Sequence, residues 1–113
     1  MHEVGLMTEI LAQAQAAARE RQATRIHRIC LRVGVLSGVE PEALCFAFAA
    51  LSPGTISEAA ELELLPVPVR CRCRGCGLAF IPVDMIFLCP SCGTLAHKAE
   101  QGQELELASL EVT

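Results

Sequence analysis

The sequence predicts an α/β (α+β) fold, in which two helices cover one face of a small three-stranded sheet and a cysteine-rich segment is inserted before the last strand. Apolar residues recur at helical spacing in two segments and alternate with polar residues in three others, and five of the seven cysteines gather in one stretch. Hydrophobic residues make up 52% of the 113 residues and charged residues 19%, which is enough apolar material for a packed core.

The first helix is expected from about residue 5 to residue 21, because apolar residues recur there every three or four positions. Within it, residues 12–18 are all Ala or Gln, and both are good helix formers. The expected buried positions are Met7, Ile10, Leu11, Ala14 and Ala18.

A strand and a second helix follow. Apolar residues alternate with largely polar ones over residues 28–35, which predicts a strand with one buried face that includes Val35. Ser37 and Gly38 indicate a turn, and Pro41 suits the first position of a helix that ends before residues 52–54. The apolar stripe of that short helix comprises Leu44, Phe48 and Leu51.

Two further strands are predicted where leucines alternate with glutamates. These segments centre on residues 61–64 and 104–107. The alternation shifts at Ala108 and Ser109 before it resumes, which indicates a β-bulge. Three strands and two helices make a small layered domain whose helices bury one face of the sheet.

Residues 70–98 differ from the rest of the chain in charge. They carry four basic residues and a single acid, whereas residues 1–69 carry five arginines and eight acids, and residues 99–113 carry only acids. Two prolines, Pro66 and Pro68, mark a boundary near Val69. We therefore predict a main domain of residues 1–69 and 99–113, interrupted by a second domain of residues 70–98.

The second domain contains two Cys-x2-Cys pairs separated by twelve residues, and each pair is followed by a glycine. This spacing lets both sulfurs of a tight turn bind one ion, and Zn²⁺ accepts four such ligands in a tetrahedron. A zinc-ribbon-like domain is the preferred interpretation, while an iron site of rubredoxin type and a redox dithiol are the alternatives. The predicted ligands are Cys73, Cys76, Cys89 and Cys92.

Four protein sulfurs would leave no open coordination position, so the zinc is expected to be structural. An insert this short is not expected to build its own core, and the metal would supply most of its folding free energy. Cys71 is a fifth thiol beside the first pair; Cys73 is preferred because its spacing mirrors that of the second pair. Cys30 and Cys45 are expected in or near the core as small hydrophobic residues.

Composition argues against several classes of function. The formal charge is −4 and aromatic residues make up only 4%, which disfavours a zinc ribbon that binds nucleic acid. That module, or a protein-binding ribbon without metal transport, is the alternative function. No apolar run is long enough to span a membrane and no signal core is present, so a cytoplasmic location is expected. No hydrolytic motif is present, and no enzymatic activity is expected.

The chain begins with Met1, His2 and Glu3. The terminal amine, the next amide nitrogen and the imidazole at position two can form fused chelate rings around one metal ion. Ni(II) and Cu(II) prefer such square-planar nitrogen ligands. Taken alone, a histidine near a chain terminus is more often simply solvated.

Four features occur together in one order along nearly the whole chain. The N-terminal Met-His-Glu precedes a helix, then come a strand-to-helix stretch, two cysteine knuckles and a closing acidic strand. The last three read "RIHRICLRVGVLSGVEPEALCFAF", then "C-x2-CG" with "CPSCG", then "GQELELASLEV". In this combination the sequence resembles the HypA/HybF family of nickel metallochaperones for hydrogenase maturation.

The resemblance implies a nickel-binding α/β domain and a zinc domain, with Zn(II) as structural cofactor and Ni(II) as cargo for the [NiFe] hydrogenase large subunit. His2 matches the residue that carries nickel, and Glu3 is a neighbour that tunes the site or contacts a partner. The four paired cysteines match the zinc ligands. The implied partner is the nickel-binding GTPase HypB, and some members also serve urease maturation.

Three points stay open from the sequence. His97 either supplies an extra nickel ligand or is a hinge residue, and the second is favoured. Glu40 either approaches the N-terminus or simply precedes the second helix, and again the second is favoured. The chain is either a monomer or a homodimer, including one that exchanges the zinc insert.

Overall fold

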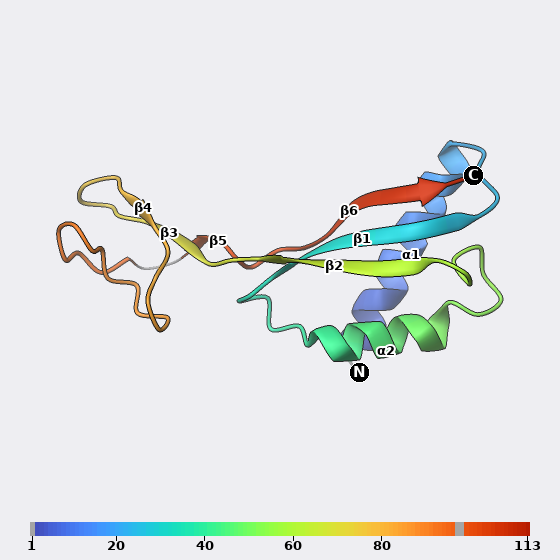
Figure 1. Cartoon of the computed structure of the whole chain (residues 1–113), viewed down its shortest axis with the longest axis horizontal. Coiled ribbons are helices and arrows are strands. Elements are labelled where there is room, and N and C mark those ends of the chain that lie inside the picture. The colour runs from blue at the N-terminus through green and yellow to red at the C-terminus, as the bar shows by residue number, and fades with distance from the viewer. Residues whose placement is uncertain (1, 97–98) are drawn as a thin grey trace.

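The computed structural model describes residues 2–96 and 99–113, which form an elongated molecule of 54 × 28 × 17 Å with a three-stranded sheet toward each end (Figure 1). In the larger sheet the central strand pairs in parallel with one neighbour and antiparallel with the other. Its strands, in spatial order, are β2 (Glu61–Val67), β1 (Ile26–Gly34) and β6 (Leu105–Val112). The predicted three-stranded sheet is confirmed.

Two helices accompany this sheet, as predicted. Helix α1 (His2–Glu20) begins three residues earlier than expected, so His2 lies in its first turn. Helix α2 (Pro41–Leu51) begins at Pro41, and the carboxylate of Glu40 caps it by accepting the Glu42 backbone N–H at 3.4 Å. Within the described residues, neither helix combines the length and apolarity needed to cross a bilayer.

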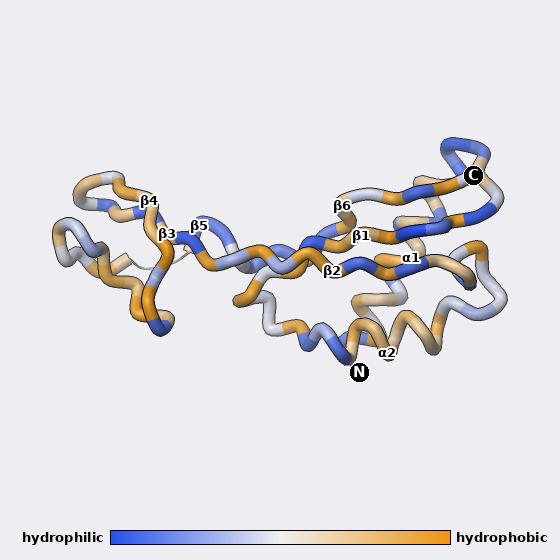
Figure 2. The backbone as a smooth tube through the Cα atoms, viewed as in Figure 1, coloured by the Kyte–Doolittle hydropathy of each residue, from blue (hydrophilic) through white to orange (hydrophobic). Residues whose placement is uncertain are grey.

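The main core lies between the two helices and one face of the larger sheet. Buried apolar residues of β1 are interrupted by the exposed His27 and Arg32, and Figure 2 shows apolar and polar residues as differently coloured bands along the strand. The buried side chains of α1 are those that the helical spacing predicts; in α2, Leu44 and Phe48 are buried as predicted, but Ala47 is buried in place of Leu51, which is half-buried. The fully buried large members of this cluster are Met7, Ile26, Ile29, Leu31 and Leu44.

Arginines of β1 bind glutamates of both neighbouring strands through their side chains. Arg28 lies 2.8 Å from a carboxylate oxygen of Glu111 on β6 and 3.2 Å from one of Glu61 on β2. Arg32 pairs with Glu106 at 3.0 Å. Each exposed pair stabilises little by itself, but together they favour one register across the three strands.

The predicted bulge in β6 is present, while two details of the prediction were wrong. Cys30 pairs with Ser109 and Leu31 with Leu107, so Ala108 is the extra residue. β1 ends at Gly34, and Val35 is 58% exposed instead of buried. Cys45 is exposed rather than in the core, because α2 is apolar on its outer face as well and apolar character alone does not locate the buried face.

The second sheet is small and lies in the cysteine-rich part. Its strands, in spatial order, are β4 (Ala79–Phe80), β3 (Arg70–Arg72) and β5 (Ala99–Gln101), all antiparallel. β5 therefore belongs to this sheet, whereas the predicted boundary assigned residues 99–101 to the main domain.

Contrary to expectation, this part has a small core of its own. Two of its seven buried residues, Cys73 and Cys89, are predicted metal ligands, so the core is built partly around the paired cysteines rather than from aliphatic side chains alone. Phe87 and Leu36 pack against it. The buried members are Val69, Cys71, Cys73, Phe80, Cys89, Ala96 and Ala99.

The end of β1 touches one of the segments that connect the two sheets, residues 102–104 between β5 and β6, and the two meet at a pair of glycines. The Leu36 backbone N–H donates to the Gly102 carbonyl at 2.7 Å, and the Gly34 N–H donates to the Glu104 carbonyl at 2.6 Å. A Cβ at Gly34 would overlap the Gly102 carbonyl and lie 2.7 Å from the Gln103 nitrogen. We call this crossing, formed by residues 34–36 and 102–104, the neck.

The Glu104 side chain stabilises the turn at residues 102–104 on one side of the neck, which gives a pH-dependent prediction. The Gly102 backbone N–H donates to its carboxylate at 2.6 Å and holds the pKa of Glu104 below its ordinary value of 4.5. A carboxyl with a lowered pKa stabilises the fold above its ordinary pKa, and that stabilisation is lost as the pH falls through the lowered value.

We therefore expect Glu104→Ala to lower the free energy of unfolding at neutral pH, and the difference from the parent protein to shrink below about pH 4.5. Urea unfolding at a series of pH values measures it. Glu9→Ala, at an exposed position of α1, is the control and should cost little. A Glu104→Ala deficit of equal size at neutral and acidic pH would contradict this explanation.

Candidate metal centre

The first cysteine pair forms a knuckle directly after β3. The Cys73 backbone N–H donates to the Leu78 carbonyl at 2.8 Å, and the Gly77 N–H donates to the Cys73 carbonyl at 3.0 Å. Gly77 has φ +77°, a left-handed conformation that glycine adopts without steric cost. The glycine after the pair therefore closes the turn that points both sulfurs to one side.

The second pair repeats this local structure. The Cys89 N–H donates to the Thr94 carbonyl at 2.9 Å, and the Gly93 N–H donates to the Cys89 carbonyl at 3.0 Å. Gly93 also has φ +77°. The two knuckles thus have matching backbone hydrogen bonds, as their matching sequences suggest.

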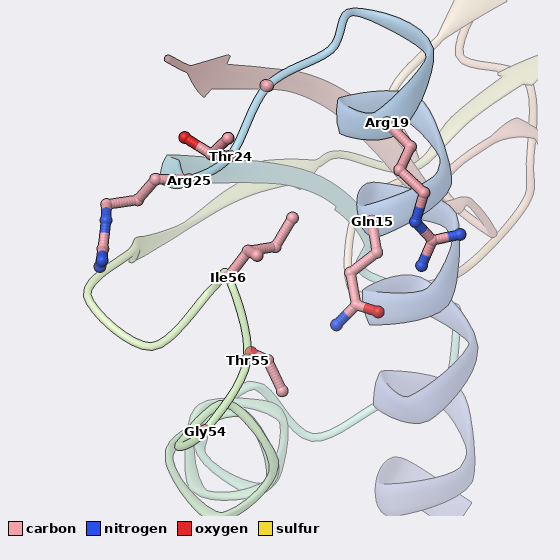
Figure 3. Close-up of a pocket in the computed structure, with 8 residues that line it drawn as sticks. Gln15, Arg19, Thr24, Arg25, Gly54, Thr55 and Ile56 are labelled. Atoms are coloured by element: carbon pink, nitrogen blue, oxygen red, sulfur yellow. The ribbon is translucent and has the colours of Figure 1, made fainter.

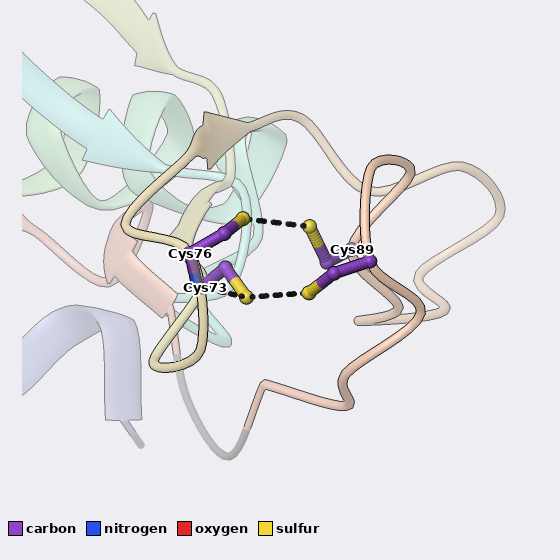
Figure 4. Close-up of side chains that lie close together, drawn as sticks. Cys73, Cys76 and Cys89 are labelled. Carbon is purple, nitrogen blue, oxygen red and sulfur yellow. Dashed lines mark hydrogen bonds between the residues drawn. The ribbon is translucent and has the colours of Figure 1, made fainter.

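The knuckles face each other and bring four sulfurs together (Figure 4). All four Sγ atoms lie within 4.8 Å of one another. Two separations across the cluster are 3.3 Å, from Cys73 to Cys92, and 3.7 Å, from Cys76 to Cys89. A tetrahedral zinc with Zn–S bonds of about 2.3 Å requires sulfurs about 3.8 Å apart. The cluster Cys73, Cys76, Cys89 and Cys92 therefore has the size of a tetrahedral thiolate site.

Backbone hydrogen bonds favour the thiolate form at Cys73. Its Sγ accepts the Cys76 N–H at 3.4 Å and the Gly75 N–H at 3.3 Å, and these donors lower the pKa of Cys73 to about 6. At Cys76 the Leu78 N–H acts in the same direction, but the sulfurs of Cys89 and Cys73 outweigh it and raise the pKa to about 11. A cation among the sulfurs would stabilise all four as thiolates.

The remaining cysteines lie outside this cluster. Cys71 is fully buried in the small core, and burial raises the pKa of its thiol. Cys30 is buried in β1, where burial likewise raises its pKa. Of the two thiols considered for the first ligand, the structure thus places Cys73 among the other sulfurs and Cys71 in the core.

The other predicted site lies at the start of α1. The His2 side chain is 64% exposed, and its Nδ1 lies 3.8 Å from the Glu3 carboxylate. Glu3 is only 14% exposed and accepts the Glu40 backbone N–H at 3.2 Å. That hydrogen bond, more than the nearby His2, lowers the pKa of Glu3. Glu40 therefore both caps α2 and reaches the N-terminus, so the two alternatives considered for it are compatible.

Sequence reasoning considered an approach of Glu40 to the N-terminus but favoured the other alternative, and it did not identify Glu3, 37 positions away, as the partner. Pro41, which fixes the start of α2, was the available signal, but it does not indicate which helix lies beside that start.

In the described part of the chain, the four cysteines are the one cluster of three or more potential metal ligands. Met1 and His97, which bear on the nickel prediction, lie outside the described residues, as does Lys98.

Comparison with known proteins agrees with this arrangement. A family model described as "Hydrogenase/urease nickel incorporation, metallochaperone, hypA" matches residues 1–112. The chain is 48% identical over 112 residues to the hydrogenase maturation factor HypA of Picosynechococcus sp., covering 99% of each chain. It is 40% identical over 112 residues to the HypA of Desulfitobacterium hafniense, covering 99% of this chain and 98% of that one.

Two solved structures share the fold. The solution structure of the Ni metallochaperone HypA from Helicobacter pylori matches with a TM-score of 0.72 and 24% identity, over 97% of this chain and 96% of that one. A second solution structure, of a HypA protein, matches with a TM-score of 0.78 and 25% identity, over 100% of this chain and 97% of that one.

Proposed function

Because the chain belongs to the HypA family of hydrogenase/urease nickel-incorporation metallochaperones, we propose that it binds Ni(II) at its N-terminus and delivers it to the [NiFe] hydrogenase large subunit. It is a maturation factor and not an enzyme. The observation that carries the proposal is the position of His2 in the first turn of α1, with an exposed imidazole.

Helix geometry supports a nitrogen site there. The first four backbone N–H groups of a helix have no partner within the helix, and in α1 these begin at His2. Its amide nitrogen can therefore become a metal ligand, after losing its proton, without breaking a helical hydrogen bond. With the terminal amine and the imidazole it makes the ligand set that Ni(II) favours.

Glu3 would act as the neighbour of this site. Its carboxylate is held by the Glu40 backbone N–H and faces His2, so it adds negative charge beside the ion without needing to bind it. The same contact joins the start of α1 to the start of α2. We propose that Glu3 and Glu40 position the N-terminus for transfer of nickel to an acceptor.

The four-cysteine cluster would hold Zn(II) with a structural role. Cys73, Cys76, Cys89 and Cys92 fit a tetrahedral ion and leave no position for water or cargo. The two metals would therefore reside in different parts of the chain, nickel at the start of α1 and zinc in the cysteine-rich part that carries β3, β4 and β5. When bound, zinc supplies folding energy and no reactive group.

The proposed partners are those of the maturation machinery: the nickel-binding GTPase HypB as the protein that cooperates in loading, and the hydrogenase large subunit as recipient. Urease maturation proteins are a further recipient for a family of this description. The proposed setting is the cytoplasm.

Nickel titration of His2→Ala tests the N-terminal site. We expect this variant to lose at least about tenfold in Ni(II) affinity, because it removes one nitrogen ligand, while its zinc content is retained. A form with residues added before Met1 should behave in the same way, since the terminal amine is displaced. Calorimetry gives the affinity and elemental analysis gives the zinc content.

His27→Ala is the matched control, because His27 is also exposed and lies in the same part of the fold, with its Nε2 2.8 Å from the Thr113 hydroxyl. It should retain nickel. Unchanged nickel affinity in both His2→Ala and the extended form would remove the basis of the proposal.

A further inference from the structure

Arginines are paired unevenly over the molecule. Four of them, on β1 and β3, bind carboxylates at distances of 2.8 to 3.5 Å. In the described part of the chain, the arginines without an ion pair are Arg19, Arg21, Arg25 and Arg74. Three of these four lie at the turn from α1 to β1. Unpaired positive charge thus gathers at one turn of a chain whose net charge is −4.

Two of the three line a hollow of about 540 Å³ between the end of α1, the following turn and the loop after α2. Figure 3 shows Arg25 extending on one side and Arg19 and Gln15 on the helix at the other side, with Ile56 and Thr55 between them. We call this hollow the arginine groove. Its lining residues are Gln15, Arg19, Ala23, Thr24, Arg25, Gly54, Thr55 and Ile56.

Neighbouring acids do not neutralise the groove by ion pairing. The Glu58 carboxylate accepts the Gly54 backbone N–H at 3.0 Å, and neither it nor the exposed Glu20 is ion-paired with a described arginine. Arg19, in the last turn of α1, also offsets the helix dipole. That role does not extend to Arg25, which lies outside the helix.

We propose that the arginine groove is a docking site for an extended acidic segment of a partner protein. Two carboxylates of that segment pair with Arg19 and Arg25, and an apolar side chain between them covers the half-buried Ile56. Charge complementarity selects this occupant, because guanidinium groups bind carboxylates with matching geometry. It also speeds the encounter of the two proteins.

The location of the groove goes beyond the proposed nickel function. From His2 to Gln15 the helix rises about 20 Å at 1.5 Å per residue. A partner held at the groove therefore leaves the N-terminal residues free. The site would anchor a partner at one end of α1 while metal transfer takes place at the other.

The test uses the zinc-loaded full chain and a synthetic hexapeptide in which four glutamates flank two leucines. We expect the peptide to bind and to shift the backbone NMR signals of residues 23–25 and 54–56. The double variant Arg19→Gln/Arg25→Gln should weaken binding about tenfold. Arg21→Gln is the control for each single change: it removes one positive charge from the same turn, as Arg19→Gln or Arg25→Gln alone does, but Arg21 does not line the groove, and its replacement should weaken binding less than about twofold.

Three results would overturn the proposal. One is an absence of peptide binding, and another is an equal loss in the double variant and in Arg21→Gln, which would indicate diffuse attraction to net charge. The third is inorganic phosphate binding as tightly as the peptide, which would make the groove a simple anion site. Nickel titration of the same variants should match the parent protein, so a failure here is separable from a failure of the N-terminal site.

Discussion

Replacing Gly34 by alanine is expected to destabilise the protein by about 3 kcal/mol or more, among the largest effects of any single methyl group in this chain. The added Cβ would overlap the Gly102 carbonyl and lie 2.7 Å from the Gln103 nitrogen. All of these clashing atoms belong to the backbone, so the clash cannot be relieved by a change of side-chain rotamer. The neck would have to open, with loss of the hydrogen bonds from Gly34 and Leu36.

Urea unfolding followed by far-UV circular dichroism measures this effect, since the chain has no Trp or Tyr to report by fluorescence. Gly5→Ala is the matched control. Gly5 lies in α1, and apart from the helix's own backbone and its chain neighbours nothing lies within 4 Å of an added Cβ, so its replacement should be neutral or should stabilise by up to about 1 kcal/mol. Equal stability of Gly34→Ala and Gly5→Ala would show that the crossing is looser than the structure indicates.

Local patterns account for the parts of the fold that the sequence predicts well. Each cysteine knuckle is determined by five consecutive residues, and in both the glycine at the fifth position takes the left-handed conformation. The bulge at Ala108 is likewise visible as a shift in alternation within one strand. In such cases the residues that make a feature are neighbours in the chain.

Features that depend on distant residues were not predictable. Gly34, at the end of β1, and Gly102, between β5 and β6, approach only because these two segments cross, and nothing near either glycine signals the other. The exposure of Cys45 is set by which face of α2 meets the sheet, and a helix that is apolar all round does not reveal that face. The contact between Glu3 and Glu40 joins two helix starts far apart in the sequence.

The structure of the candidate site alone does not identify the function of the protein. A thiol cluster identifies a metal-binding module but not a purpose, because tetrahedral thiolate sites are structural in many unrelated proteins. The N-terminal His-Glu pair is small and exposed on one side. Its place in the first turn of α1, together with the family match over residues 1–112, supports the role proposed for it.

Removing the metal from the four-cysteine cluster should have the largest effect of all, and it should be confined to one part of the molecule. Structural zinc contributes about 10 to 16 kcal/mol of apparent binding free energy at neutral pH. The small core includes Cys73 and Cys89, so without the ion its packing is disrupted by the repulsion or protonation of crowded sulfurs. The main core contains none of the four and should persist.

Cys89→Ser should therefore lose bound zinc and the hydrogen-exchange protection of amides between residues 70 and 101, while amides of α1 and β1 stay protected. Chelation of the parent protein should reproduce this pattern, and elemental analysis distinguishes zinc from iron. Cys45→Ser is the control and should retain both the metal and protection, because Cys45 is exposed and outside the cluster.

Cys71→Ser should keep the metal but lower stability, since it places a hydroxyl in a fully buried position. If the β3 amides kept their protection after complete metal removal, the aliphatic part of the small core would be sufficient to fold it, and a structural role for the ion would be excluded.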